Sequence, residues 1–167
     1  MSAAPADLTI RVARRDDLPA LDEGVPTKGV GGNADRLERS LSGASCLLLA
    51  FVGDACVGRG EVMWTPKEDA VRAEYPDVPE LNGLDVPEAW RRRGVGTALV
   101  EAAADLARER GCTAIGLGVG LDNEAAYRLY ARLGFTGDLE YVDQYTIVFE
   151  GVRHDFADPC RYLLRPL

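Results

Sequence analysis

The sequence predicts an α/β (or α+β) domain whose sheet is partly antiparallel and carries helices on both faces. Strand-like and helix-like patterns follow one another in the order strand, helices, hairpin, strand, long helix, strand, helix, strand, strand. Gly53-Asp54 separates two apolar runs, which is a signal for a hairpin. The chain has 167 residues, of which 47% are hydrophobic, and this suits one globular domain with a substantial core.

The first part of the chain predicts a strand and then a short helix. Leu8–Val12 alternates between apolar and polar residues, as a half-buried strand does. Asp16, Asp17 and Pro19 supply capping and first-turn residues for a helix that runs through Leu21.

A glycine-rich loop and a second helix come next. Gly24 to Gly32 holds four glycines and a proline, so we expect a loop that can move. Asn33 or Asp35 can cap a helix that carries Leu37 and Leu41 on one face.

The hairpin leads into a buried strand. Ser45–Val52 and Ala55–Trp64 are apolar runs of strand length. Thr65 to Pro79 is polar and contains three prolines, so we expect a surface loop beside the site. Glu80–Val86 predicts the strand that enters the central turn.

After that turn, a long helix is predicted over Thr97–Arg110, with Gly111 as its left-handed cap. Thr113–Val119 predicts a strand in which glycine recurs, and glycine in a strand often marks the close approach of another backbone or a ligand. The remaining elements are a helix opened by Asp122-Asn123 and ended by Gly134, and strands over Tyr141–Phe149 and Cys160–Leu164.

The central turn has the composition of an anion-binding site. Its sequence is Arg91-Arg92-Arg93-Gly94-Val95-Gly96, and it connects a strand to the start of a helix. Amide groups in the first helical turn have no acceptor within the helix, and the helix dipole favours negative charge there. Gly94 and Gly96 let an anion approach the backbone, and the arginines add positive charge. The turn therefore predicts a phosphate site, for a pyrophosphate rather than a single carboxylate. The alternative on these residues alone is an ordinary exposed basic turn.

Known phosphate motifs narrow this interpretation. The chain has no P-loop sequence. The turn also lacks the dinucleotide-binding pattern Gly-x-Gly-x-x-Gly, because Leu99 stands where the third glycine would be. Arg91, Gly94 and Gly96 match Arg-x-x-Gly-x-Gly, which resembles the coenzyme A pyrophosphate loop of the GNAT family of N-acetyltransferases.

A second motif strengthens the resemblance. Asn123, Ala126, Tyr130, Gly134 and Phe135 match the GNAT pattern Asn-x-x-Ala-x-x-x-Tyr-x-x-x-Gly-Phe, one helix and one strand after the turn. The chain is identified as a member of this family, with Arg92-Arg93 departing mildly from relatives that carry a glycine among the arginines. The resemblance implies one GNAT-like domain over residues 1–167, with a flexible tail at 1–7. It also implies a mostly antiparallel central sheet of about seven strands.

The resemblance also implies acetyl-CoA as co-substrate and a primary amine as acceptor, with direct transfer in a ternary complex. Backbone groups of Leu84, Asp85 and Val86 would bond the pantetheine arm and the thioester oxygen. The expected coenzyme A contacts are Leu84, Asp85, Val86, Arg91, Arg92, Arg93, Gly94, Val95, Gly96, Thr97, Asn123, Ala126 and Tyr130.

Two residues are expected to move protons. By resemblance, Tyr130 protonates the departing thiolate, whereas the residues alone favour a core aromatic on an amphipathic helix. Asn123 could equally be a helix cap, or serve both roles. Glu80 is the first candidate for the base that takes the amine proton, with Asn82 on the same face of its strand. Glu61 is the second candidate, and a water relay is an alternative.

Composition argues against several other classes of protein. The net charge of −8 argues against nucleic-acid binding and favours a cationic acceptor. No apolar run is long enough for a membrane helix, and the N-terminus does not resemble a signal peptide. Scattered cysteines and a single histidine, His154 in an expected loop, predict no metal site and a cytoplasmic protein. Cys56 and Cys112 have no base to activate them, so we expect packing roles.

The acceptor has no readable motif. We expect it to contact Gly24 to Gly32, Thr65 to Pro79 and Tyr141 to Asp158, the variable segments. A homodimer is plausible from the resemblance. Alternative functions are transfer of a longer acyl group and a non-catalytic coenzyme A sensor.

Overall fold

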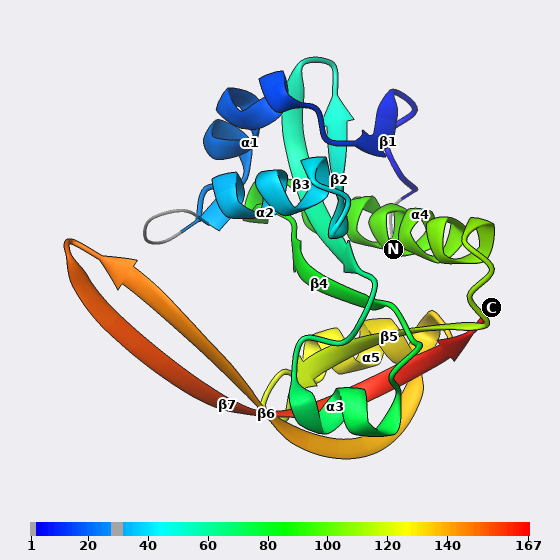
Figure 1. Ribbon diagram of the computed structural model, residues 1–167. Coiled ribbons are helices and arrows are strands. Elements are labelled where there is room, and N and C mark those ends of the chain that lie inside the picture. The colour runs from blue at the N-terminus through cyan, green and yellow to red at the C-terminus, as the bar shows by residue number, and fades with distance from the viewer. Residues whose placement is uncertain (1–2, 28–31) are drawn as a thin grey trace.

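A computed structural model describes residues 3–27 and 32–167. Its seven strands form a single sheet in the order β1-β2-β3-β4-β5-β7-β6 (Figure 1). Neighbouring strands are antiparallel except β4 and β5, which are parallel. The predicted mixed, mostly antiparallel seven-stranded sheet is confirmed. The strands are β1 Leu8–Val12, β2 Ser45–Val52, β3 Ala55–Met63, β4 Glu80–Asp85, β5 Ala114–Gly120, β6 Thr136–Phe149 and β7 Val152–Pro166.

Helices cover both faces of the sheet, as the sequence predicts. They are α1 Leu18–Gly24, α2 Gly32–Leu41, α3 Asp69–Glu74, α4 Val95–Glu109 and α5 Glu124–Arg132, with short 3₁₀ turns at Arg15–Asp17 and Glu88–Trp90. No helix within residues 3–27 and 32–167 has the length and apolar character needed to cross a bilayer.

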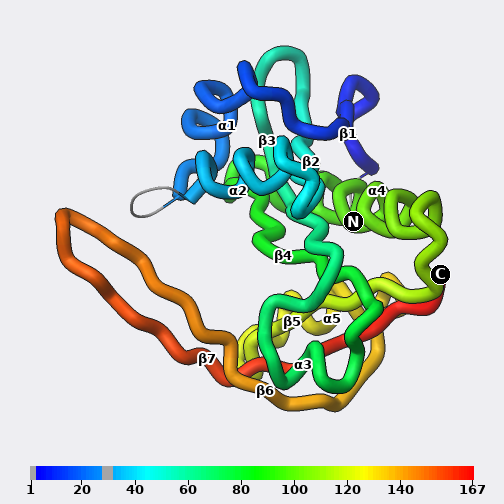
Figure 2. Tube along the Cα trace, viewed as in Figure 1, coloured from blue at the N-terminus to red at the C-terminus, as the bar shows by residue number. Residues whose placement is uncertain are grey.

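The two cores follow from the alternation of side chains along β2. Leu47 and Leu49 point to one side, where they pack with α1 and α2. Leu48 and Ala50 point to the other side, where they join the apolar stripe of α4, which includes Leu99. The tube in Figure 2 shows α1 and α2 separated from α4 by β2 and β3.

Several predicted boundaries were wrong. The expected loop over Thr65 to Pro79 contains α3, whose Val71 is fully buried. The long helix begins at Val95 rather than Thr97, because Gly94 takes a left-handed conformation (φ 77°) and starts the helix directly after it. Part of the Gly24 to Gly32 loop, residues 28–31, lies outside the described residues, as do residues 1–2 of the expected tail.

The last two strands are longer than predicted and form a protruding hairpin (Figure 1). Pairing continues without interruption from Leu139 opposite Tyr162 to Phe149 opposite Val152. His154, expected in a loop, lies on β7 opposite Ile147. Backbone pairing with β6 overrides the polar character of this stretch, because an exposed ribbon tolerates polar residues on its strands.

Neighbouring tyrosine side chains explain why glycine recurs in β5. A Cβ at Gly116 would collide with the Tyr162 ring, and a Cβ at Gly118 would collide with the Tyr141 hydroxyl. The Tyr162 and Tyr141 side chains therefore occupy the space that side chains at these two positions would need, which is one physical reason for glycine in this strand.

Candidate functional site

A cavity of about 1120 Å³ opens where β4 and β5 separate. The described pairing of these strands consists of Glu80 opposite Gly116. Beyond that point, residues from both strands line the cavity, among them Leu84 and Asp85 on β4 and Gly118 on β5. The splayed strands thus leave a space between them at the centre of the sheet.

A bulge in β4 turns its backbone toward this space. Arg59 on β3 lies opposite Asp85 while Glu61 lies opposite Asn82, so β4 has one extra residue here. Gly83 adopts φ 60°, and a side chain there would collide with the guanidinium of Arg36. The buried Arg59 donates a hydrogen bond to the Gly83 carbonyl and holds the bulge in place.

The predicted pyrophosphate turn lies directly beyond β4. The Arg91 Nε donates to the Val86 carbonyl (2.8 Å), which ties the turn to the end of the strand. Arg92 (φ 62°) is left-handed like Gly94, and the Arg93 guanidinium lies 5.0 Å from the centre of the Trp90 ring. In the described part of the chain, none of residues 91–97 lines the cavity itself.

The start of α4 is open to an incoming anion. Gly94 has no side chain with which to cap the helix. A Cβ at Gly96 would have only Val86 near it, at 3.8 Å. There is therefore room beside Gly96 for an anion to approach, and the assignment of the turn to a pyrophosphate stays a prediction.

Asn123 and Tyr130 reach the cavity from α5. The Asn123 Oδ1 accepts a hydrogen bond from the Ala126 amide (3.2 Å), so the capping role is confirmed while its side chain also lines the cavity. Tyr130 packs edge-on against Phe135, with 6.0 Å between ring centres. Burial raises the pKa of Tyr130, so its phenol remains protonated at neutral pH.

Glu80 lies at the floor of the cavity and is 3% exposed. Burial raises its pKa, against hydrogen bonds from the Asn82 side chain (3.2 Å) and the Lys67 amide (3.4 Å). The predicted proximity of Asn82 is confirmed. A carboxylate with a raised pKa is a stronger base than an exposed glutamate, and this one borders the reaction space.

Glu61 has a different environment, which makes it a structural residue. It is fully buried away from the cavity lining and accepts hydrogen bonds from Arg36 (2.6 Å), Arg39 (2.8 Å) and the Ser45 hydroxyl (2.7 Å). Burial would raise its pKa, but the hydrogen bonds from Arg39 and Ser45 hold that pKa below its usual range. These contacts occupy both carboxylate oxygens, so Glu61 is poorly placed to accept a proton from an amine.

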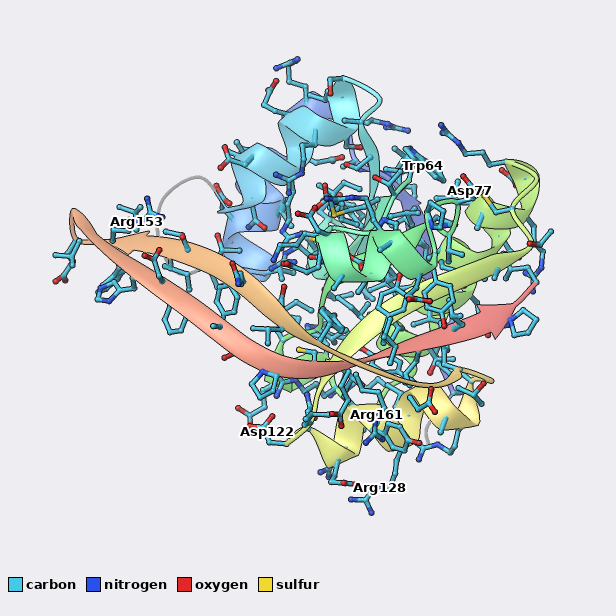
Figure 3. The ribbon with its side chains drawn as sticks, turned by 60° about the horizontal axis from the view of Figure 1, so that its bottom comes forward. Trp64, Asp77, Asp122, Arg128, Arg153 and Arg161 are labelled. Carbon is cyan, nitrogen blue, oxygen red and sulfur yellow. The ribbon has the colours of Figure 1, made fainter. Side chains whose placement is uncertain are left out.

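All three segments expected beside the acceptor contribute to the cavity lining, but the residues involved could not be named from the sequence. They are Pro26, Thr27, Lys67, Glu68 and a set from the hairpin that includes Asp143 and Asp158. Figure 3 labels Asp122, also a lining residue, and Arg153 far out on the hairpin.

The cysteines show no sign of nucleophilic chemistry. All four are free thiols. Burial raises the pKa of Cys56 and of Cys160, which keeps them in the unreactive thiol form. Across the residues that the structure describes, no group of histidine, cysteine and acidic side chains is arranged to hold a metal ion.

Comparisons with known proteins agree with this geometry. A sequence model described as "Acetyltransferase (GNAT) family" matches residues 16–135. The chain is 35% identical over 83 residues to N-alpha-acetyltransferase 30 of Schizosaccharomyces pombe, covering 50% of each protein. It is 43% identical over 104 residues to aminoglycoside N(6')-acetyltransferase type 1 of Klebsiella aerogenes, covering 62% of this chain and 67% of that one. Apart from that enzyme, the chain spans half the length or less of the curated relatives it matches.

Solved structures show the same fold. A GNAT acetyltransferase from Elizabethkingia anophelis with acetyl-CoA bound superposes with a TM-score of 0.66, covering 98% of this chain and all of that one. The sequence identity is 16%, so this likeness concerns the fold alone.

Proposed function

The chain belongs to the GNAT family of acetyltransferases, and from that premise we propose that it transfers an acetyl group from acetyl-CoA to a primary amine. The observation that carries this proposal is the cavity at the splayed strands, which Glu80 and Tyr130 both line. It offers a buried base on one side and a protonated phenol on the other. Direct transfer within one ternary complex requires both groups at the same space.

The residues around the head of α4 fit coenzyme A. The open amides of the first turn and Gly96 suit the pyrophosphate, and Arg92 adds an exposed positive charge. The bulged end of β4, from Leu84 to Val86, would bond the pantetheine arm, with Asn123 on the opposite side of the space. The end of β4 lines the cavity and the turn follows it in the chain, so an elongated cofactor can contact both.

Each reacting group then has a defined task. When bound, acetyl-CoA supplies a thioester whose carbonyl carbon is open to attack by an amine. Glu80 accepts the proton that the attacking amine must lose, and its low exposure keeps it basic. Tyr130 donates a proton to the departing thiolate. The backbone amide of Val86 would stabilise the negative charge that develops on the thioester oxygen.

The test is release of free thiol from acetyl-CoA in the presence of a panel of primary amines. Tyr130→Phe and Glu80→Gln should each lower kcat by about 100-fold, the smaller end of the usual effect of one acid or base. Tyr127→Phe is the matched control, since Tyr127 lies one turn earlier on α5 and stacks with Arg161. Coenzyme A binding without turnover on any amine would instead identify a sensor.

The turn is tested separately by calorimetric titration with coenzyme A. Gly94→Asp and Gly96→Asp each place a negative charge where the pyrophosphate would sit, and we expect both to abolish binding. Gly53→Asp is the control, because Gly53 is also left-handed (φ 58°) and has open space around it. Wild-type affinity in the two turn variants would contradict the assignment of the turn.

The acceptor class that we favour is cationic. Among the residues that the structure describes, six acidic and three basic residues line the cavity, so these side chains carry a net negative charge. One matched relative is named for N-alpha-acetylation and another for aminoglycosides, and the acceptors of both present an amine. We place the protein in the cytoplasm, which suits four free thiols.

We also propose a homodimer formed by the outer half of the hairpin. A two-stranded ribbon is barely stable alone in water, and this one exposes Phe149 (50%) and Val152 (55%). A second copy presents an identical apolar surface, as a two-fold interface requires. Sedimentation should show a dimer for the wild type and a monomer for Phe149→Ser, whereas Leu121→Ser, exposed elsewhere, should leave the dimer intact. A monomeric wild type would refute this proposal.

A further inference from the structure

The ammonium group of Lys67 is bound inside the cavity as a ligand would be. Its Nζ lies 2.7 Å from Asp143 Oδ1, 2.8 Å from the Gln144 carbonyl oxygen and 3.3 Å from Glu68 Oε1. The centre of the Tyr145 ring is 5.8 Å away, within range of a cation–π interaction. An ammonium group has three N–H donors, and three acceptors surround this one.

The hairpin brings together more negative charge than Lys67 can balance. Asp143 and Asp158 lie directly opposite each other on β6 and β7, and both line the cavity. Like charges directly opposite in a ladder are destabilising. Asp158 accepts a hydrogen bond from the Tyr145 hydroxyl (2.8 Å), a neutral donor. Two further cations among the described lining residues are engaged elsewhere, since Arg36 pairs with Glu61 and Arg59 lies beside Asp85.

Lys67 also spans the gap between this cluster and Glu80. Its own backbone amide contacts Glu80 Oε2 at 3.4 Å, while its Nζ reaches Asp143. The two nitrogens of a lysine are separated by the same number of carbon atoms as those of pentane-1,5-diamine. The gap between Glu80 Oε2 and Asp143 Oδ1 is therefore within the span of a short aliphatic diamine.

We propose that Asp143, Glu68 and Tyr145 form a subsite for the second ammonium group of a diamine acceptor. The subsite is the position that the Lys67 ammonium fills in this structure. The inference rests on the proposed acetyl transfer at Glu80 and adds to it the class of acceptor. Lys67 competes with the acceptor for the same carboxylates, and it must release Asp143 for the acceptor to bind.

The experiment compares pentane-1,5-diamine with pentan-1-amine, which lacks the second nitrogen. Dissociation constants are measured by calorimetric titration and KM by thiol release, for wild type, Asp143→Asn and Lys67→Met. Asp155→Asn is the matched control, because Asp155 lies on the same hairpin but bonds Thr146 and Arg153 on the opposite face. Thermal unfolding of each variant verifies that the hairpin remains folded.

Asp143→Asn should weaken diamine binding about five- to tenfold, a modest effect because the Asp143 side chain is 31% exposed. Lys67→Met should tighten diamine binding about fivefold by removing the competing charge. Both variants should change pentan-1-amine binding and turnover less than those of the diamine, because the monoamine has no second ammonium group, and Asp155→Asn should change neither amine.

Two results would overturn the subsite. One is an equal effect of Asp143→Asn on the two amines, and the other is weaker diamine binding in Lys67→Met. Either of these with continued turnover would leave the proposed acetyl transfer intact. Diamine binding that depends on Asp143, without turnover of any amine, would support the subsite and count against acetyl transfer.

Discussion

The buried carboxylate of Glu61 offers the sharpest test of how this sheet is stabilised. Glu61 is fully buried on β3, and its partners Arg36 and Arg39 come from α2 while Ser45 comes from β2. Glu61→Gln keeps the shape and one acceptor oxygen but removes the negative charge. Two guanidinium groups then lose the counter-charge that holds α2 against the sheet.

The magnitude follows from the exposure of the partners. Removing one member of a buried ion pair costs about 3–5 kcal/mol when the other charge remains buried. Here the side chains of Arg36 and Arg39 are 21% and 41% exposed, so both can recover hydration. We therefore expect the lower end, about 3 kcal/mol. For a chain of this length, that loss corresponds to a fall in Tm of about 6–12 °C.

The assay is thermal and urea unfolding of Glu61→Gln, with Glu38→Gln as control. Glu38 also lies on α2, but its pair with Arg15 is solvent-exposed, so its loss should cost less than about 1 kcal/mol. Because the folded-state pKa of Glu61 is lowered, its stabilisation is present above the ordinary value of 4.5 and is lost as pH falls through the folded value. The difference in unfolding free energy between wild type and Glu61→Gln should therefore shrink in acid. A Tm within about 2 °C of wild type at neutral pH would refute the reasoning.

Three further predictions concern the site. Arg92→Gly should raise stability by about 1 kcal/mol in thermal unfolding, because it relieves a left-handed backbone, yet weaken coenzyme A binding in calorimetry. Gly118→Ala should cost about 1–3 kcal/mol in urea unfolding, and Tyr141→Phe, by removing the hydroxyl that collides with the new methyl, should recover part of the loss. The acid limb of the kcat/KM pH profile should lie above 4.5 because the pKa of Glu80 is raised. For the same reason, the Glu80 side chain stabilises the fold below pH 4.5, and this stabilisation is lost as pH rises through its folded-state pKa. The stability of Glu80→Gln should therefore increase relative to that of the wild type as pH increases.

Local signals in the sequence were sufficient for most of the fold. Gly111 (φ 84°) and Gly134 (φ 92°) both adopt the left-handed conformation expected after a helix. Gly53-Asp54 forms the turn between β2 and β3. Each of these depends on a few neighbouring residues, and so does the order of strand, turn and helix around the predicted pyrophosphate turn.

Features that depend on distant residues could not be predicted. α3 forms in a proline-rich stretch because Val71 is buried, and the tertiary contacts that bury it are absent from the local pattern. The length of the hairpin likewise comes from pairing between strands whose exposed faces carry no clean alternation. Glu61 seemed a plausible base because the arginines that bind it lie more than 20 residues earlier in the chain.

The same distinction separates the two halves of the site. The expected coenzyme A side is built from consecutive residues at one strand–helix junction, so a short motif can specify it. The acceptor side joins Lys67 and Glu68, which precede α3, to Asp143 and Asp158 on a hairpin more than 70 residues later. A substitution on the hairpin can change the charge facing the acceptor while the turn, β4 and Glu80 stay as they are. A common fold can therefore keep its acyl donor and change its acceptor, and the motifs that identify the family carry information about the donor alone.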